Sequence, residues 1–332
     1  MSELRWDPLL GEWVITATER QERTFLPPKD FCPLCPARPD GVPTEIGRAD
    51  FDVVVFDNRF PSLRPDSPPP AVTGTALMPV RPAEGACEVV VYTPRHEGTL
   101  ADASLGRLRR LVAVWADRTT ALAHRSGIDY VYVFENKGEV IGVTLAHPHG
   151  QIYAYPFIPP VVDREVAQAA KHRSETGGCL WCDVLHEERE DGRRVVFEAG
   201  SWTATVPFFA RWPYEAHLVP SRHVGFLSEL TAGERDGLAV TLKAVLAKYD
   251  ALFGFSLPYI MAVHQAPVRT DASAYHLHVE FYPPNRTASK LKYLAGSEAG
   301  AGAFINDTLP EETAAELRTL EPTTVEAVRA GS

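Results

Sequence analysis

The sequence predicts an α+β fold in which one unit of helix and sheet occurs twice. Two short segments, Thr93–His96 and Pro220–His223, end in the same Arg-His pair. Each is followed by an amphipathic helix pattern, a strand, a loop and a His-x-His pair, which begins at His147 in one case and at His276 in the other. The spacing from segment to pair is nearly equal. Such self-similarity indicates an internal duplication.

Hydrophobic periodicity places the elements of the first half. The helix is the clearest, because Leu105, Leu108, Leu111, Val112 and Trp115 recur at the 3.6-residue period. In order, we expect a strand pair over 5–16, a strand over 51–57, a loop rich in Pro, Ser and Gly over 62–86, a strand over 88–92, a helix over 103–126 and a strand over 128–135.

The second half repeats this pattern, and we draw the boundary near residue 160, giving halves 1–160 and 161–332. Apolar residues again mark one face of a long helix, and Thr308-Leu309-Pro310-Glu311 is a plausible helix start. In order, we expect a helix over 162–173, strands over 195–198 and 203–207, a helix over 231–253, a strand over 258–264 and a capping helix over 311–320.

Composition excludes several classes of protein. The chain carries a formal net charge of -10, and non-specific nucleic-acid binding requires a basic surface instead. No apolar run approaches the roughly 20 residues of a membrane span. The segment Met1–Trp6 has no signal-peptide hydrophobic region. We therefore expect a cytoplasmic protein with no nucleic-acid or membrane partner.

Four of the five cysteines form two Cys-x-x-Cys pairs, Cys32/Cys35 and Cys179/Cys182. In a cytosolic chain such pairs indicate metal binding rather than disulfides. Cys87 stands alone before an apolar strand and is interpreted as a small buried hydrophobe.

The stretch Ala146–Tyr153 is the most informative part of the chain. Pro148 disfavours the α region for His147, so the segment is expected to be extended. His147, His149 and Gln151 then point the same way. An imidazole nucleophile beside an amide donor suits phosphoryl chemistry. A bare His-x-His would more often be a metal-binding or surface pair, but His-Pro-His-Gly-Gln is a more specific string.

This string, with Phe134–Gly138 upstream, resembles the active-site motif of the galactose-1-phosphate uridylyltransferases, a branch of the histidine-triad superfamily. The resemblance covers about Arg5 to Asp307. It implies two histidine-triad-like halves, each with a half-barrel antiparallel sheet and flanking helices. Dinucleoside tetraphosphate phosphorylases and ADP-glucose phosphorylases carry a similar His-x-His-x-Gln, but the inserted Pro and Gly favour the uridylyltransferases.

The activity implied is a ping-pong transfer in galactose metabolism, in which His149 takes a uridylyl group from UDP-glucose and passes it to galactose 1-phosphate. Gln151 would donate to a phosphoryl oxygen, and the carbonyl of His147 would fix the tautomer of His149. The resemblance also implies a homodimer whose C-terminal arm reaches the partner's hexose site. Further substrate contacts implied by position are Arg20, Arg23, Asn58, Asn136, Gly142, Thr144, Lys292 and Glu298. Ser297 and Phe304 depart from well-known members.

Metal sites follow from the same resemblance and from the ligand types. Cysteine and histidine in sets of two favour zinc, and two such sets occur at matching positions of the repeat: Cys32, Cys35, His96 and His147, and then Cys179, Cys182, His223 and His276. We expect zinc at the first set and hypothesise zinc at the second. The family's iron-type site maps onto Glu165, His264, His278 and Glu280. There Glu280 replaces a histidine, so we expect this site to be vacant or weakly occupied.

Two alternatives remain at this stage. The chain could be a phosphorylase acting on ADP-glucose or a dinucleoside polyphosphate, or a non-catalytic, zinc-stabilised nucleotide-binding protein. Intact His149 and Gln151 argue against the second. A Cys2His2 nucleic-acid finger is unsuitable, because the separation of Cys35 from His96 far exceeds finger spacing.

Overall fold

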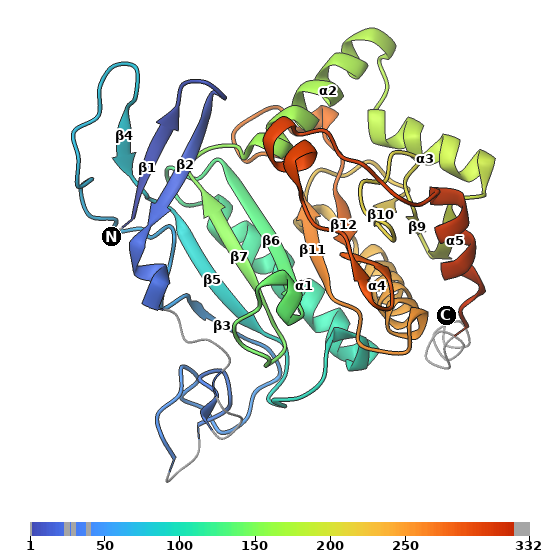
Figure 1. Cartoon of the computed structure of the whole chain (residues 1–332), viewed down its shortest axis with the longest axis horizontal. Coiled ribbons are helices and arrows are strands. Elements are labelled where there is room, and N and C mark those ends of the chain that lie inside the picture. The colour runs from blue at the N-terminus through green and yellow to red at the C-terminus, as the bar shows by residue number, and fades with distance from the viewer. Residues whose placement is uncertain (1, 23–26, 28–30, 38–40, 322–332) are drawn as a thin grey trace.

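The computed structural model describes residues 2–22, 27, 31–37 and 41–321. Its centre is a nine-stranded sheet with the order β3-β5-β7-β6-β11-β12-β10-β9-β8, in which every neighbouring pair is antiparallel (Figure 1). The expected α+β class is confirmed. The strands are β3 (Val54–Asp57), β5 (Ala86–Val91), β6 (Tyr130–Lys137), β7 (His149–Tyr155), β8 (Val195–Ala199), β9 (Trp202–Thr205), β10 (Ala216–Pro220), β11 (Tyr259–His264) and β12 (His278–Tyr282).

The strand order makes the duplication visible. Strands β5, β6 and β7 of the first half correspond to β10, β11 and β12 of the second, and the two sets meet at the β6–β11 pair in the middle of the sheet. The cross-strand pair Val89↔Gln151 of the first half has its counterpart in His217↔Glu280 of the second. Residues at repeat positions therefore occupy equivalent places on the same sheet.

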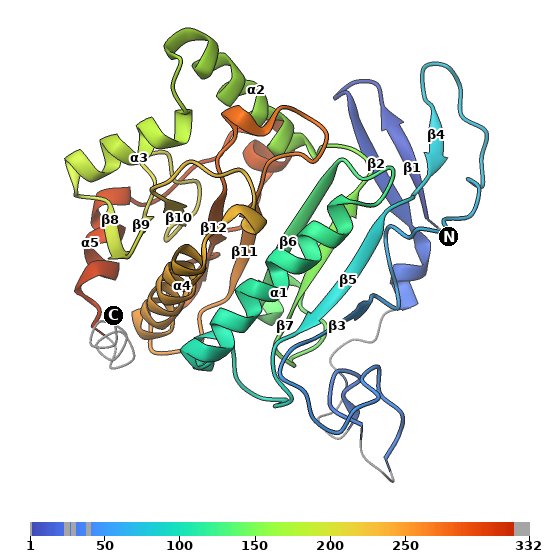
Figure 2. The same ribbon diagram turned by 180° about the vertical axis from the view of Figure 1, so that it is seen from behind.

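Two long helices cover one face of the sheet, α1 (Leu105–Ala123) and α4 (Ala232–Leu252), as Figure 2 shows. Each begins at a hydroxyl N-cap: Ser104 Oγ accepts from Arg107 N, and Thr231 and Glu234 form a capping box. The apolar stripe of α1 that the sequence predicts is buried against the sheet, with Trp115 at its centre. We call the face of the sheet that α1 and α4 cover the helix face.

Helix α4 is buried on nearly all sides, which its charged residues do not suggest. The ammonium of Lys243 donates to Ala103 O at 2.9 Å, and that of Lys248 donates to Leu320 O at 2.7 Å. Carbonyl groups at helix ends and in loops lack hydrogen-bond partners within a helix. The two buried ammonium groups donate hydrogen bonds to such carbonyls. Lys248 thereby ties α4 to the end of α5 (Pro310–Thr319).

The opposite face of the sheet, here called the polar face, carries His149 and Gln151 of β7 and His278 and Glu280 of β12, since side chains alternate along each strand. Strands β1 (Ser2–Asp7), β2 (Glu12–Ala17) and β4 (Val80–Pro82) form a small separate sheet. Its Leu4 packs with Cys87 and Tyr153 of the large sheet. The buried setting of Cys87 agrees with its interpretation as a small hydrophobe.

Several elements differ from expectation. Strand β4 lies inside the segment 62–86 that was expected to be a loop, because it pairs with β1. Helix α3 (Leu180–Asp191) was not predicted: it buries only Leu185 and Glu188 along its length, so its sequence looks like a solvated charge run. Strand β10 is buried at all five positions and shows no alternation. The helix expected over 162–173 is α2 (Pro160–Thr176), which begins at Pro160. Two short strands follow near the C-terminus, β13 (Asn285–Thr287) and β14 (Lys290–Leu291). Within the described residues, no helix is both long and apolar enough to cross a membrane.

Candidate active site and metal centres

His149 stands at the start of β7 and lines a cavity on the polar face of the sheet. Its Nδ1–H donates to the carbonyl oxygen of His147 at 2.7 Å. That bond fixes the tautomer and leaves Nε2 with a lone pair. Burial lowers the pKa of His149, and the bond to the carbonyl opposes this shift only in part. The imidazole is therefore neutral and able to act as a nucleophile near pH 7.

Gln151 lines the same cavity, two residues further along β7. Its Oε1 accepts a hydrogen bond from Asn58 Nδ2 at 3.2 Å, and Asn58 Oδ1 in turn accepts from the backbone N–H of Phe60 at 2.9 Å. This chain of bonds orients the Gln151 amide so that its NH2 group remains as the donor end. An amide donor beside a neutral imidazole suits the binding of a phosphoryl group.

Two of the other predicted contacts, Asn58 and Thr144, line the same cavity, whereas Arg20, Asn136 and Gly142 are not among its lining residues. On β6, Phe134 pairs with Gln151, and Asn136 lies two residues further along the strand, so it points to the same face of the sheet as Phe134. Gly142 adopts a left-handed φ of 84°, a conformation that favours glycine. Arg20 is anchored by Ser62 Oγ at 2.6 Å and by the hydroxyl of Tyr153 at 2.9 Å.

Lys292 and Glu298 are brought together in the C-terminal arm, but not at this cavity. The Lys292 ammonium lies 3.0 Å from Glu298 Oε1, and both side chains are buried within their own chain. Neither is among the residues that line the cavity. Arg23 lies outside the described residues.

The cavity also has walls that sequence reasoning did not single out. Their signal was weak: Arg59 and Phe60 adjoin Asn58, and Val89 lies directly across from Gln151. Apolar and aromatic walls with a few polar groups are typical of small-molecule sites. The unpredicted lining residues are Pro33, Leu34, Glu45, Phe56, Arg59, Phe60, Val89 and Leu145.

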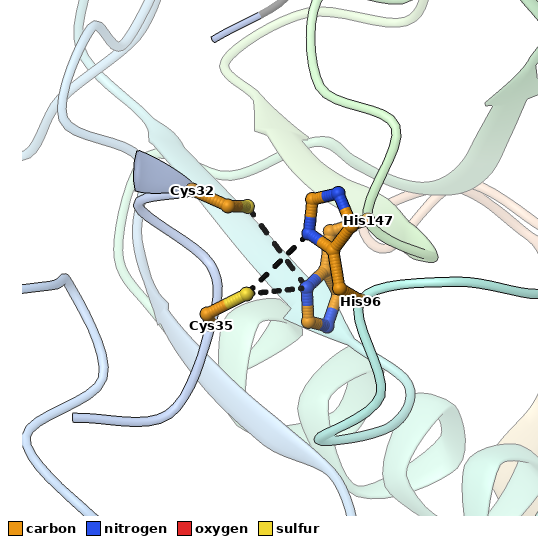
Figure 3. A group of neighbouring side chains, drawn as sticks. All are labelled: Cys32, Cys35, His96 and His147. Atoms are coloured by element: carbon orange, nitrogen blue, oxygen red, sulfur yellow. Dashed lines mark hydrogen bonds between the residues drawn. The ribbon is translucent and has the colours of Figure 1, made fainter. Parts of the chain in front are cut away.

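The first Cys2His2 set is assembled as predicted (Figure 3). Cys35 Sγ lies 3.4 Å from His96 Nδ1 and 3.6 Å from His147 Nδ1, and Cys32 Sγ lies 4.0 Å from His147 Nδ1. Zinc bond lengths in a tetrahedral site imply a sulfur–nitrogen separation of about 3.6 Å. His147 Nε2–H donates to Thr93 O at 2.7 Å, which leaves Nδ1 as the ligand atom. The geometry fits a tetrahedral metal ion.

The second set repeats this geometry. His276 Nδ1 lies 3.6 Å from Cys179 Sγ and 3.5 Å from Cys182 Sγ, and His276 Nε2–H donates to Pro220 O at 3.0 Å. Nδ1 of His223 is buried and finds no hydrogen-bond partner among the described residues. An orphaned ring nitrogen facing two sulfurs and an imidazole is the arrangement a metal ligand would have.

The third group, Glu165, His264, His278 and Glu280, also comes together. Here the charges already compensate one another. Burial lowers the pKa of His264, but the carboxylates of Glu165, 3.0 Å away, and Glu280 outweigh it and raise that pKa to about 9. His217, a buried residue that the sequence did not indicate, lies 3.4 Å from Glu280.

The second half also differs at the place of the nucleophile. His278 Nδ1–H donates to His276 O at 2.9 Å, as His149 does to His147. However, the indole of Trp181 stacks on the His278 ring at 4.0 Å between centroids. Glu280, in place of Gln151, would repel a phosphoryl group. The second half therefore keeps the metal geometry but loses the nucleophile's setting.

Together, a duplicated α+β fold, a tautomer-fixed histidine beside an amide donor and a neighbouring Cys2His2 set define a nucleotide-processing protein of the histidine-triad kind. The comparisons with known proteins specify the family. The N-terminal domain of galactose-1-phosphate uridyl transferases matches residues 1–159, and the C-terminal domain matches residues 165–328. The chain belongs to the galactose-1-phosphate uridyl transferase family.

Individual relatives agree over almost the whole length. A galactose-1-phosphate uridylyltransferase of Thermotoga maritima is 43% identical over 325 residues, covering 97% of this chain and 99% of the relative. One from Streptomyces lividans is 41% identical over 298 residues, covering 86% and 78%. A solved uridylyltransferase superposes with a TM-score of 0.86 at 37% identity, covering 98% and 99%. An ADP-glucose phosphorylase from Arabidopsis thaliana is more distant, with a TM-score of 0.74 at 25% identity and coverage of 97% and 99%.

Proposed function

We propose that the protein is a UDP-glucose–hexose-1-phosphate uridylyltransferase that works through a covalent uridylyl-histidine. The observation that carries the proposal is the 2.7 Å bond from His149 Nδ1 to the His147 carbonyl, beside an oriented Gln151 in one cavity. The carbonyl keeps a proton on Nδ1, so Nε2 is the attacking atom.

In the first half-reaction, His149 Nε2 attacks the α-phosphorus of UDP-glucose. A P–N bond forms, the P–O bond to glucose 1-phosphate breaks, and the electron pair leaves with that phosphate. The ring carries a positive charge that the His147 carbonyl stabilises. In the second, a phosphate oxygen of galactose 1-phosphate attacks the same phosphorus, the P–N bond breaks, and neutral His149 is restored with UDP-galactose as product.

Gln151 donates from its amide to a non-bridging oxygen during both displacements. Removing one such donor costs about 2.7–4 kcal/mol of barrier. Asn58 holds the Gln151 amide in this orientation. In this proposal the uridine diphosphate is further held by Arg20, Arg23, Asn136, Gly142 and Thr144, since guanidinium forks, amides and open backbone suit phosphate oxygens.

Both Cys2His2 sets are proposed to hold structural zinc. The sulfur–nitrogen distances near 3.6 Å and the orphaned His223 Nδ1 support this. The first ion would anchor the strand that presents His149, because His147 is one of its ligands. At the third group, Glu165 and Glu280 already pair with His264, so this proposal leaves the site vacant or weakly occupied. His278 Nε2 is nevertheless buried there without a hydrogen-bond partner among the described residues.

We further propose a homodimer in which Lys292 and Glu298 serve the partner's hexose site, with each chain divided near residue 160. The arm that carries these residues exposes large apolar side chains: Tyr293 leaves 71% and Ile305 56% of its surface exposed. Exposed apolar side chains grouped on one segment are typical of an interface.

The test is a substrate panel. Galactose 1-phosphate and other hexose 1-phosphates are offered with UDP-glucose, and ADP-glucose is offered with inorganic phosphate. The proposal expects UDP-galactose formation from the first pair, abolished by His149→Asn. Turnover of ADP-glucose with phosphate, without uridylyl transfer, would instead establish the phosphorylase activity. No turnover with any pair would favour a nucleotide-binding protein.

A further inference from the structure

A buried polar pair lies on the helix face of the sheet, directly behind the nucleophile's strand. Tyr92, just after β5, and Glu135, on β6, expose 1% and 4% of their surfaces. The Tyr92 hydroxyl donates to Glu135 Oε2 at 3.5 Å. Neither residue touches the His149 cavity, which lies on the other face.

Tyr92 contacts both residues that flank His149. Its backbone N–H donates to the carbonyl of Pro148 at 3.1 Å. Its phenol occupies the space on the back of Gly150: a Cβ added there would overlap the hydroxyl and lie 3.0 Å from Tyr92 Cζ. The glycine of the His-Pro-His-Gly-Gln string is therefore required by this tyrosine.

Glu135 fixes the phenol in that place. It is fully enclosed, and burial raises its pKa to about 8, although Lys137 opposes the shift. The surrounding groups leave it little freedom, because Tyr259 lies against it from β11 and the Lys137 ammonium is held by Asp250 of α4 at 2.9 Å. A carboxyl group in an apolar layer is costly to folding, and the hydrogen bond that it accepts from the Tyr92 hydroxyl links it to the tyrosine behind the nucleophile's strand.

We infer that Tyr92 and Glu135 are positioning residues for the uridylyl transfer, which hold the main chain of Pro148–Gly150 and thereby set the place of His149 Nε2. The inference rests on the proposed function. The Tyr92 main chain fixes residue 148, its phenol fixes residue 150, and the imidazole between them is aimed at the front of the sheet. A displacement of about 1 Å at a reacting atom is enough to cost roughly 100-fold in rate.

The test compares conservative variants in the first half-reaction, with UDP-glucose alone. Tyr92→Phe keeps the ring but removes the hydroxyl, and Glu135→Gln keeps the shape of the acceptor. Each should lower the rate constant of uridylyl-enzyme formation about 10- to 100-fold while the KM for UDP-glucose stays within about two-fold. The double variant should lose no more than the worse single variant, because the two share one hydrogen bond.

Matched controls separate positioning from general stability. Tyr249→Phe removes a buried hydroxyl that donates to Tyr214 O at 2.7 Å, on the same helix face but away from β7. Glu88→Gln changes an equally buried carboxyl on β5, paired with Arg118. Both should keep the rate constant of the unmutated protein even if their melting temperatures fall.

Three outcomes would overturn the inference: full rates in Tyr92→Phe and Glu135→Gln, an equal loss in the controls, or a loss confined to KM. Failure of the proposed function can be told apart from failure of this inference, because in the former case even the unmutated protein would form no uridylyl-enzyme. A uridylyl-enzyme in the unmutated protein, with unchanged rates in both variants, would remove only the positioning role.

Discussion

Gly150→Ala tests how tightly the nucleophile's strand is confined between the two faces of the sheet. The added Cβ would overlap the Tyr92 hydroxyl and lie 2.9 Å from the carbonyl oxygen of Phe134, whereas ordinary contacts begin at 3.4 Å. Neither neighbour can give way easily, because one is bonded to Glu135 and the other is backbone of β6. Overpacking of this kind costs about 1–3 kcal/mol.

The same substitution should impair catalysis more than folding. If the strand yields by roughly 1 Å, the rate of uridylyl transfer should fall about 100-fold. Urea unfolding gives the free energy, and steady-state kcat with UDP-glucose and galactose 1-phosphate gives the activity.

The matched control is Gly106→Ala on α1, where the new Cβ meets only Arg110 Nη1 at 3.9 Å. Alanine in a helix is favoured by about 0.8–1 kcal/mol over glycine, so this variant should be slightly more stable and fully active. A Gly150→Ala protein as stable and as active as the unmutated protein would refute the reasoning.

Three further results are expected. Because burial raises the pKa of Glu135 to about 8, folding favours its protonated form. The contribution of Glu135 to stability is thus complete below the ordinary glutamate pKa and is lost as pH rises through 8. In urea unfolding, the stability of Glu135→Gln should therefore gain about 2–3 kcal/mol relative to the unmutated protein between pH 6 and pH 9. Parallel stability curves for the two proteins would contradict this. Elemental analysis should find about two zinc ions per chain, falling to about one in Cys179→Ser with a lower melting temperature, whereas one ion in both proteins would show the second set to be empty. Mixed His149→Asn and Lys292→Ala chains should recover activity through one intact hybrid site, and subunit exchange without recovery would exclude the shared site.

The sequence predicted what the duplication repeats. Both Cys2His2 sets could be assigned because the ligand types recur in the same order, and the structure brings each set within bonding range of one ion. The extended course of His149-Gly150-Gln151 was predictable from alternation. The expectation that the strand also includes His147 is wrong, because residues 147–148 form a bend and β7 begins at His149. Helix α1 followed from its apolar period.

What the sequence could not show is which residues meet across the fold. Nothing local indicates that Tyr92 lies behind Gly150, or that His217 joins the ion pairs around Glu280, because both contacts arise from strand pairing. Helix α3 was missed for a related reason. Few of its apolar residues pack against the rest of the protein, so its sequence shows little hydrophobic periodicity. Lys292 and Glu298 could be aligned with the family, but their mutual ion pair depends on how the arm folds back.

The covalent intermediate tests the central claim most directly. The protein is incubated with UDP-glucose alone, and intact and peptide mass spectra are recorded. The account predicts release of glucose 1-phosphate and a uridylyl adduct on His149, absent in a folded His149→Asn variant. An adduct on any other residue, or glucose 1-phosphate released without an adduct, would contradict it.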